Sequence, residues 1–258
     1  ASHVPLYSAS WQTAPMGFGP SPDRLFDRPL SVVEKVQGAP VAWVAQRCRT
    51  PNRRQEYVQA LAQHIPIHSF GICMHTVNFP KGVRTSRTDA HMQLSRAGTV
   101  PMVDTQMEEL VAQYKFYLAF EAENCDDYVT EKFFRSLYAG SVPVVMGAPN
   151  IRRYAPSNAS YIDVADFQGP RALAEYLQYL DRDDAAYQKH LQWKQTRQVP
   201  EEYRRLLESH DMPGSDFRGY SRSMNRIVCD LCHKLQQGTP HRAAYTARCE
   251  SPSWDLNA

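Results

Sequence analysis

The fold is decided by residues 115–147, which read KFYLAFEAENCDDYVTEKFFRSLYAGSVPVVMG. The apolar run over residues 115–120 is typical of a buried strand. Residues 127–139 are predicted to form a helix, and Gly140 stands where a glycine commonly ends one. A second apolar run over residues 141–146 predicts another strand. Two buried strands joined by a helix indicate a parallel sheet with a crossover connection.

The same alternation of strands and helices extends on both sides of this stretch. Three more strands are predicted at residues 41–45, 65–70 and 161–164. Helices are predicted at 53–64, 107–112 and 170–180, with a further helix ending near residue 194. We therefore expect an α/β fold, a Rossmann-like parallel sheet with helices on both faces. Such a sheet binds ligands beyond the carboxyl ends of its strands.

The predicted domain spans residues 41–235, with less regular chain on either side. Residues 1–40 contain six prolines and little periodicity, so they are predicted to be a linker or the edge of another domain. Residues 74–104 are polar and long for a loop within a domain, which favours an insertion or a functional loop. Residues 236–258 are predicted to be an irregular tail.

Composition excludes several functional classes. The 258 residues include 29 basic and 27 acidic ones, and a net charge of +2 excludes a nucleic-acid polycation. No apolar run is long enough to span a membrane. The chain starts at Ala1 rather than Met, so membrane attachment is expected only through an anchor upstream of it. Six cysteines and a glycosylation sequon at Asn158 favour the secretory pathway, with a cytosolic protein holding buried free thiols as the alternative.

Residues 120–132 link a strand end to a helix start and carry side chains suited to phosphate and sugar. A helix start offers unpaired backbone N–H groups and a positive dipole end to a phosphate. Lys132 adds a full positive charge, Tyr128 offers a ring and a hydroxyl, and Glu131 can accept from sugar hydroxyls. The chain has no G-x-G-x-x-G or Walker A loop, so side chains must grip the phosphate. The alternative is a plain helix start, with Thr130 as the cap and with Glu131 and Lys132 solvated.

Three blocks of sequence form a long and specific signature: YKFYLAFE at 114–121, DYVTEK at 127–132 and AGSVPVV at 139–145. This signature resembles that of the α1,3-fucosyltransferases. The runs FFRSL at 133–137 and GAPNI at 147–151 are most similar to the branch that fucosylates the N-glycan core in plants. The resemblance implies the donor domain of a two-domain GT-B glycosyltransferase, with this chain as its carboxy-terminal half.

The resemblance also implies an activity. L-Fucose would pass from GDP-β-L-fucose, with inversion, to a GlcNAc hydroxyl of a glycoprotein N-glycan in α1,3 linkage. GDP-fucose is then the donor substrate and a glycoprotein or oligosaccharide the acceptor. A divalent metal is neither required nor excluded. The family's general base lies in the amino-terminal domain, so no residue of this chain is assigned as the base. The implied location is the Golgi lumen, as a type II membrane protein.

Two other functions remain open at this point. One is a non-catalytic nucleotide-sugar-binding module that keeps the fold without turnover. The other is an α1,3-fucosyltransferase that acts on the antennae of glycans, as in Lewis-type structures.

Four residues fall on donor-contacting positions of the family. Lys132 falls on its phosphate-binding lysine, and Glu131 and Tyr128 fall on its donor-contacting Glu and Tyr. Arg54 falls on the arginine that grips the diphosphate. An arginine and a lysine together can neutralise a diphosphate that no metal holds. The alternative for Arg54 is a solvated helix arginine, like its neighbour Arg53.

One position departs from the family and two motifs resemble metal sites. Ala122 stands where the family has an Asn that helps to hold the nucleotide, and Asn124 is the candidate substitute. Residues 181–183 spell D-x-D, which metal-dependent glycosyltransferases use, but here they lie between two helices and are predicted to be solvated. The acidic pair at 126–127 is better explained by complementing a helix dipole.

The cysteines predict disulfides. Cys48 and Cys73 are each predicted to end a strand, at residues 41–48 and 65–73, and a strand–helix–strand unit places such strands side by side, so these two are predicted to pair. Cys229 and Cys232 are the next candidate pair, although their spacing also occurs in zinc sites. Cys125 lies in the donor loop without a nearby histidine to activate it as a nucleophile.

Overall fold

The computed structural model describes residues 22–81, 83, 105–204, 249–251 and 254. They form a five-stranded parallel sheet in the order β2-β1-β3-β4-β5. The strands are β1 Val41–Trp43, β2 Ile67–Ser69, β3 Phe116–Phe120, β4 Val142–Met146 and β5 Ile162–Asp163. All five predicted strands are therefore confirmed, with shorter bounds than the sequence suggested.

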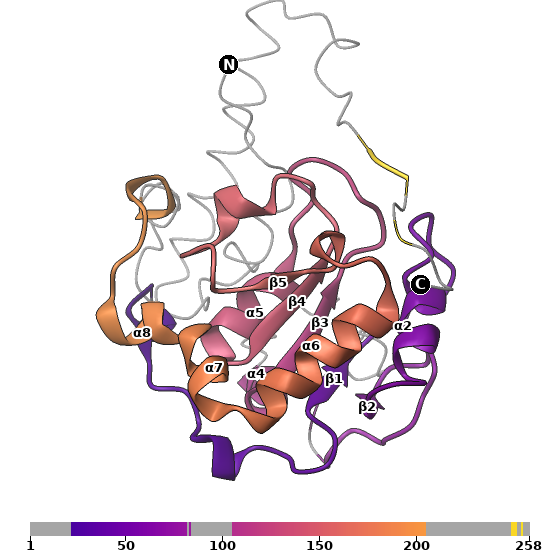
Figure 1. Ribbon diagram of the computed structural model, residues 1–258, viewed down its shortest axis with the longest axis horizontal. Helices are drawn as coiled ribbons and strands as arrows, with labels where there is room; N and C mark the ends of the chain where they lie inside the picture. Colours follow the sequence, from indigo (N-terminus) through magenta and orange to yellow (C-terminus); the bar gives the residue numbers. More distant parts are fainter. Residues whose placement is uncertain (1–21, 82, 84–104, 205–248, 252–253, 255–258) are drawn as a thin grey trace, which may run out of the picture.

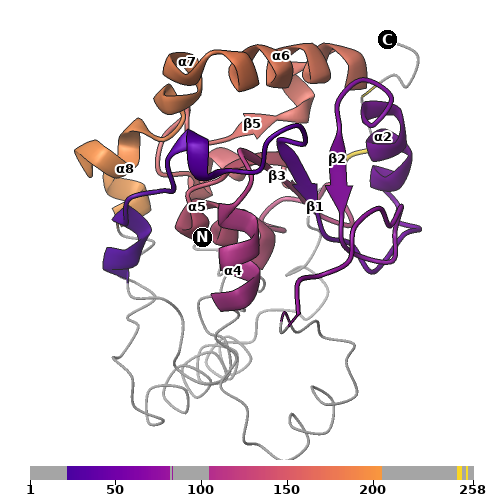
Figure 2. The same ribbon diagram turned by 90° about the horizontal axis from the view of Figure 1, so that it is seen from below.

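Helices cover both faces of the sheet (Figures 1 and 2). One face packs against α2 Arg54–Leu61, α6 Pro170–Arg182 and α7 Asp184–Lys189. The other packs against α4 Thr105–Ala112 and α5 Glu131–Ala139, with the short helix η1 Pro22–Phe26 and α8 Gln192–Thr196 beside them. This arrangement confirms the predicted Rossmann-like α/β fold.

Alternate residues of the strands supply the two cores, as the two-residue period of a strand requires. In β3, Phe116, Leu118 and Phe120 face the α2/α6 side, while Tyr117 and Ala119 face the α4/α5 side. All five residues of β3 are buried, because helices cover both sides of a central strand.

Helix α5 begins at Glu131, four residues later than predicted. Asp127 has a left-handed backbone (φ 61°), and Thr130 is extended, so the chain cannot be helical before residue 131. The helix ends at Gly140, as predicted. Gly140 is left-handed (φ 68°), and a Cβ on it would lie 2.4 Å from the side chain of Pro29.

Residues at both ends of the described chain contact the domain, and one predicted helix needs correction. The described part of the predicted linker, residues 22–40, packs on the domain: Leu25 is fully buried, and Lys35, which directly follows the short helix η2 Val32–Glu34, is buried as well. The described part of the predicted tail contacts the domain through Cys249 and Trp254. The helix predicted to end near residue 194 is instead two helices, α7 and α8, separated near His190, whose ring bonds the Ala159 carbonyl.

The disulfide predicted between Cys48 and Cys73 is present and joins the segments that follow β1 and β2. Cys229 and Cys232 lie outside the described residues, as does most of the predicted functional loop at 74–104. None of the described helices is long and apolar enough to cross a membrane.

Candidate functional site

A pocket of about 240 Å³ opens at the carboxyl ends of β3, β4 and β5. It lies where a parallel sheet is expected to bind its ligand. Two turns that follow β3 and β4 supply most of its wall, and a segment from the end of the chain closes one side. The lining residues are Ala119, Glu121, Asn124, Tyr128, Val129, Phe133, Val145, Met146, Gly147, Ala148, Pro149, Ile151, Asp163, Val164, Ala165, Glu250, Ser251 and Trp254.

Glu121 is the centre of a buried polar cluster directly after β3. Its side chain is only 4% exposed and accepts from the Thr130 backbone N–H (2.8 Å) and hydroxyl (2.6 Å). It also pairs with the Lys132 ammonium at 2.9 Å. A Cβ on Gly147 would lie 3.0 Å from the Glu121 side chain, so the glycine leaves room for this cluster. The Thr130 side chain therefore links the helix start to β3 and does not cap α5.

The charges around Lys132 hold it in its ionised form. Burial opposes that charge, but Glu121 and Glu131 outweigh it and raise the pKa of the ammonium. Glu131 lies 3.5 Å from the ammonium. Burial also opposes the Glu131 charge, yet Lys132 and Arg135 lower the pKa of its carboxyl. The alternative of a solvated lysine at a plain helix start is wrong, because the Lys132 side chain is 19% exposed and bonded to its neighbours.

Arg54 is the first residue of α2 and is 4% exposed, unlike the exposed Arg53 beside it. Its guanidinium donates to the carbonyl oxygens of Phe120 and Arg47. Burial lowers the pKa of Arg54, an effect that the charge of Glu121 opposes. The side chain thus reaches the end of β3, but it does not line the pocket. Its role in gripping a diphosphate remains a prediction.

Tyr128 and Asn124 both line the pocket. Burial raises the pKa of the Tyr128 hydroxyl, and the Glu121 charge adds to the effect. The Asn52 side chain, which sequence reasoning missed, is buried and donates to the Glu121 carbonyl (2.9 Å) and to Asn124 Oδ1 (3.0 Å). Asn124 is therefore held at the pocket wall, in reach of a ligand.

A segment near the carboxyl terminus forms one side of the pocket. Cys249 is joined to Cys125 by a disulfide, and the Glu250 backbone N–H donates to the Asn124 carbonyl at 2.8 Å. Trp254 packs edge-on against Tyr57, with 5.2 Å between ring centres. Arg53 lies over the Trp254 ring at 5.6 Å. Sequence reasoning missed this wall, because nothing local in an irregular tail indicates which distant loop it meets.

Asp163, at the end of β5, is a further pocket residue that sequence reasoning missed. Its carboxylate accepts from the Ala165 backbone N–H at 3.0 Å and so begins the short helix η4 Val164–Asp166. Burial, with a smaller contribution from the charge of Asp166, raises the pKa of Asp163 to about 6. The signal was in the sequence: Asp163 is a polar residue at the carboxyl end of a predicted strand.

The metal-like motifs have structural partners. Asp181 pairs with the Lys115 ammonium at 3.0 Å, and Asp183 caps α7 by accepting from the Ala186 N–H. Asp127 accepts from the side chains of Asn150 and Tyr154.

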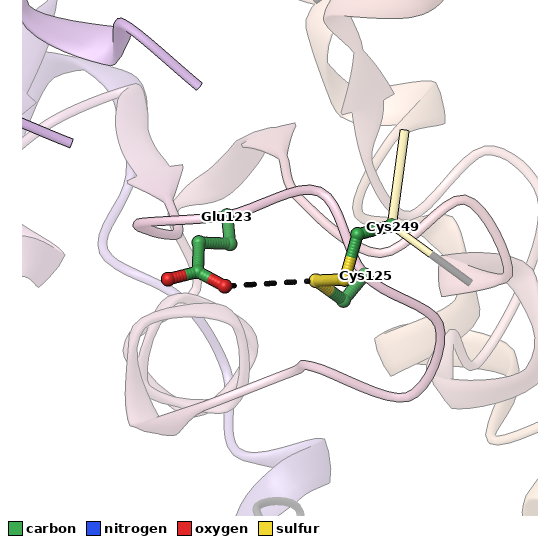
Figure 3. A group of neighbouring side chains, drawn as sticks. All are labelled: Glu123, Cys125 and Cys249. Carbon is green, nitrogen blue, oxygen red and sulfur yellow. Dashed lines mark hydrogen bonds between the residues drawn. A yellow bond between two sulfur atoms is a disulfide. The ribbon is translucent and has the colours of Figure 1, made fainter. Parts of the chain in front are cut away.

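Glu123, Cys125 and Cys249 form the one group of potential metal ligands among the described residues (Figure 3). The two sulfur atoms of this group are bonded to each other, so neither is a thiolate available to a metal. Cys125 is likewise no nucleophile. Asn158, the sequon residue, is exposed.

The chain matches the family described as "Glycosyltransferase family 10 (fucosyltransferase) C-term" over residues 34–248. It belongs to that family. The match contains every pocket residue except those that follow residue 248.

Several relatives are named GDP-fucose protein O-fucosyltransferase 3. The chain is 42% identical to the one from Danio rerio over 161 residues, which are 62% of this chain and 32% of the relative. It is 38% identical to the one from Homo sapiens over 156 residues, 60% of this chain and 30% of the relative. The chain thus spans about a third of the length of these curated relatives. A crystal structure of an α1,3-fucosyltransferase with GDP-fucose is 23% identical, with a TM-score of 0.46 over 63% of this chain and 40% of that one.

Proposed function

We propose that this chain is the GDP-fucose-binding domain of a fucosyltransferase. The observation that carries the proposal is the pocket at the carboxyl edge of the sheet, lined by the signature segment of a fucosyltransferase family domain. The names of the relatives support GDP-fucose as the donor. A non-catalytic nucleotide-sugar-binding module is the second candidate, and the replacement of the family's Asn by Ala122 favours it.

The proposed chemistry is displacement of GDP from fucose by an acceptor hydroxyl. Negative charge develops on the leaving diphosphate, and fixed cations at that point lower the barrier. The Lys132 ammonium has three N–H donors, of which two are directed at Glu121 and Thr130. Lys132 does not itself line the pocket, and Glu131 lies 3.5 Å from its ammonium, but Lys132 is bonded to Glu121, which does line the pocket. We propose that the third N–H serves the leaving phosphate, held in place by the two internal bonds.

The general base is expected outside the donor loop. Glu121 accepts three hydrogen bonds within the fold, and Asp127 accepts from Asn150, Arg153 and Tyr154. Carboxylates occupied in this way are poorly placed to take a proton from an acceptor. In this proposal the base belongs to the facing domain that the family resemblance implies.

The proposed acceptor is a side-chain hydroxyl of a protein, because the relatives are named protein O-fucosyltransferases. The GlcNAc of an N-glycan core is the second candidate, favoured by the runs at 133–137 and 147–151, and Lewis-type antennae are a third. Full-length protein supplied with GDP-fucose, an unglycosylated protein and the matching N-glycoprotein separates them. Fucose found by mass on the unglycosylated protein supports the first candidate, and fucose found only on glycan overturns it.

Donor binding is tested by calorimetry with GDP and GDP-fucose. Lys132→Met should weaken binding by about 1.5–3 kcal/mol, the size of a hydrogen bond to a charged group. The double variant Glu121→Gln/Lys132→Met should weaken it equally, which separates the loss of the cation from the loss of the buried pair. Lys189→Met removes an exposed lysine on α7 and should leave affinity unchanged. Unchanged GDP affinity in both Lys132 variants would contradict the assignment.

The Golgi lumen is the proposed location of the full protein. Two disulfides join four of its cysteines, and disulfides persist in oxidising compartments. The exposed Asn158 sequon is accessible to glycosylation. Occupancy of Asn158, read by mass spectrometry of the cell-expressed protein, tests passage through the secretory pathway.

A further inference from the structure

We propose that the Asp163 carboxylate recognises the guanine base of the donor, by accepting from its N1–H and its 2-amino group. This inference rests on the proposed function, because it assigns one end of the same pocket. It makes Asp163 the residue that determines which nucleotide the domain selects.

The position of Asp163 suits this task. It is the last residue of β5 and pairs in register with Val145 of β4, and both residues line the pocket. The lining residues Val164 and Ala165 follow directly. The carboxylate thus lies at the β5 side of the pocket, while Glu121 and the Lys132 cluster lie at the β3 side.

The fold makes little use of the Asp163 charge. Its one hydrogen bond among the described residues comes from the Ala165 N–H, and an asparagine oxygen would accept that bond as well. Burial acts against the charge, and no basic side chain in the described part of the chain offsets it. A charge that the fold penalises and does not pair is expected to have a partner in the ligand.

The other carboxylates of the pocket are less suited to the base. Glu121 already accepts three hydrogen bonds from Thr130 and Lys132. Glu250 is exposed at the rim. Asp163 is therefore the lining carboxylate, among those described, that is both sheltered and still able to accept.

The walls beside Asp163 match a flat base better than a sugar. Val145, Met146 and Val164 are apolar and buried, and Trp254 offers an aromatic ring. Tyr57 packs edge-on against Trp254, and the Asp163 charge helps to raise the pKa of the Tyr57 hydroxyl. A nucleobase has apolar faces and a polar edge, whereas a sugar carries hydroxyls on all sides.

A carboxylate discriminates among bases by its two acceptor oxygens. Guanine presents two adjacent donors, N1–H and the 2-amino group. Uracil presents one N–H between two carbonyl oxygens, and adenine presents a ring nitrogen acceptor beside its amino group, so either would leave a carboxylate oxygen facing an acceptor. Such mismatches of buried polar groups are strongly rejected.

Calorimetry of the wild-type chain and Asp163→Asn, with GDP and xanthosine diphosphate (XDP), tests the proposal. Asp163→Asn keeps the shape and the bond from Ala165 while it removes the charge. GDP affinity should fall about 10- to 100-fold. XDP affinity should rise, because xanthine carries a carbonyl at C2 that accepts from the asparagine amide. Asp166→Asn, three residues on and exposed, is the matched control and should behave as wild type.

The outcomes separate this inference from the proposed function. Unchanged GDP affinity in Asp163→Asn, or an equal loss for GDP and XDP, would overturn the assignment and leave GDP binding intact. Failure of the wild-type chain to bind GDP would overturn both. Thermal unfolding at pH 7 is the control for folding, and Asp163→Asn should be at least as stable as wild type, since it removes a half-buried charge that no described cation pairs.

Discussion

Charged side chains have different surroundings at the amino ends of the strands and at their carboxyl ends. We call these two sides of the sheet the amino edge and the carboxyl edge. At the amino edge, Lys35 is 2% exposed and donates to the carbonyl oxygens of Ala112, Tyr114 and Gly140 at 2.9–3.2 Å. Lys115, just before β3, bonds the carbonyl and carboxylate of Asp181. All these partners are internal, so the amino edge is closed.

At the carboxyl edge, the pocket has the hydrogen-bonded Glu121–Lys132 pair on one side and the Asp163 carboxylate, which can accept further hydrogen bonds, on the other. Glu121 and Lys132 pair with each other at 2.9 Å, and in the proposed function one Lys132 N–H remains for the ligand. Asp163, on the far side of the pocket, has a half-buried charge with no described cation. A buried ionisable group such as Lys35, whose donors all have internal partners, does not by itself mark a site. A polar group beside a cavity that can still form hydrogen bonds is the better indication of a site.

The largest expected effect comes from breaking the Glu121–Lys132 pair. Lys132→Met leaves a carboxylate that is 4% exposed without its cation, and should lower the free energy of unfolding by about 3–5 kcal/mol. Adding Glu121→Gln should recover most of that loss. Urea unfolding of both variants checks this. A loss below about 1 kcal/mol for Lys132→Met is the size expected for an exposed ion pair, and it would contradict a stabilising role for this buried pair.

The two disulfides should differ in what they do for the pocket. Replacing Cys125 and Cys249 by Ser should cost about 2–5 kcal/mol of stability and also weaken GDP binding, because it releases the wall that holds Trp254 and Glu250. Replacing Cys48 and Cys73 should cost about 3 kcal/mol but leave GDP affinity unchanged, since neither lines the pocket. Equal effects of the two double variants on GDP affinity would refute the distinction.

Lys35→Met should destabilise the amino edge by about 1–3 kcal/mol, because three buried carbonyl oxygens lose their donor. Burial, with the charges of Lys115 and Lys194, lowers the pKa of Lys35 to about 7. Between that pH and the ordinary lysine pKa of about 10.4, the unfolded chain holds more protons, so the wild type gains stability as pH rises. The advantage of wild type over Lys35→Met should therefore grow over this range, and parallel stability–pH curves would contradict the assigned pKa.

The smallest expected effect is a pH dependence of GDP binding. The pKa of Asp163 is raised to about 6 by burial and by Asp166, with Tyr57 and Tyr161 the other titratable groups that interact with it. Because guanine needs the ionised carboxylate, affinity should fall about tenfold as pH drops from 7 to 5. Calorimetry at the two pH values measures it. Asp163→Asn should lack this dependence, and an equal fall in that variant would assign the effect to another group.

Much of the fold could be predicted from the sequence because its strands are short apolar runs bounded by glycine or polar residues. The start of α5 could not, since it depends on the contacts of Asp127 with Asn150 and Tyr154 across the β4 turn. The dense signature directed attention to the loop after β3, and of its candidates Tyr128 and Asn124 line the pocket. Trp254 and Asn52 were missed because their roles come from contacts between segments far apart in sequence. Asp163 could have been found from the sequence, because it is a polar residue at the carboxyl end of a predicted strand.

The difference between the two edges is tested most directly by hydrogen–deuterium exchange of the chain with and without saturating GDP. The account predicts slower exchange at the carboxyl edge, in residues 121–130, 147–151, 163–165 and 249–251. It predicts no change at the amino edge, in residues 112–115 and 140–142. Protection confined to the amino edge, or GDP binding without protection around Glu121 and Asp163, would contradict the claim that this pocket holds the nucleotide.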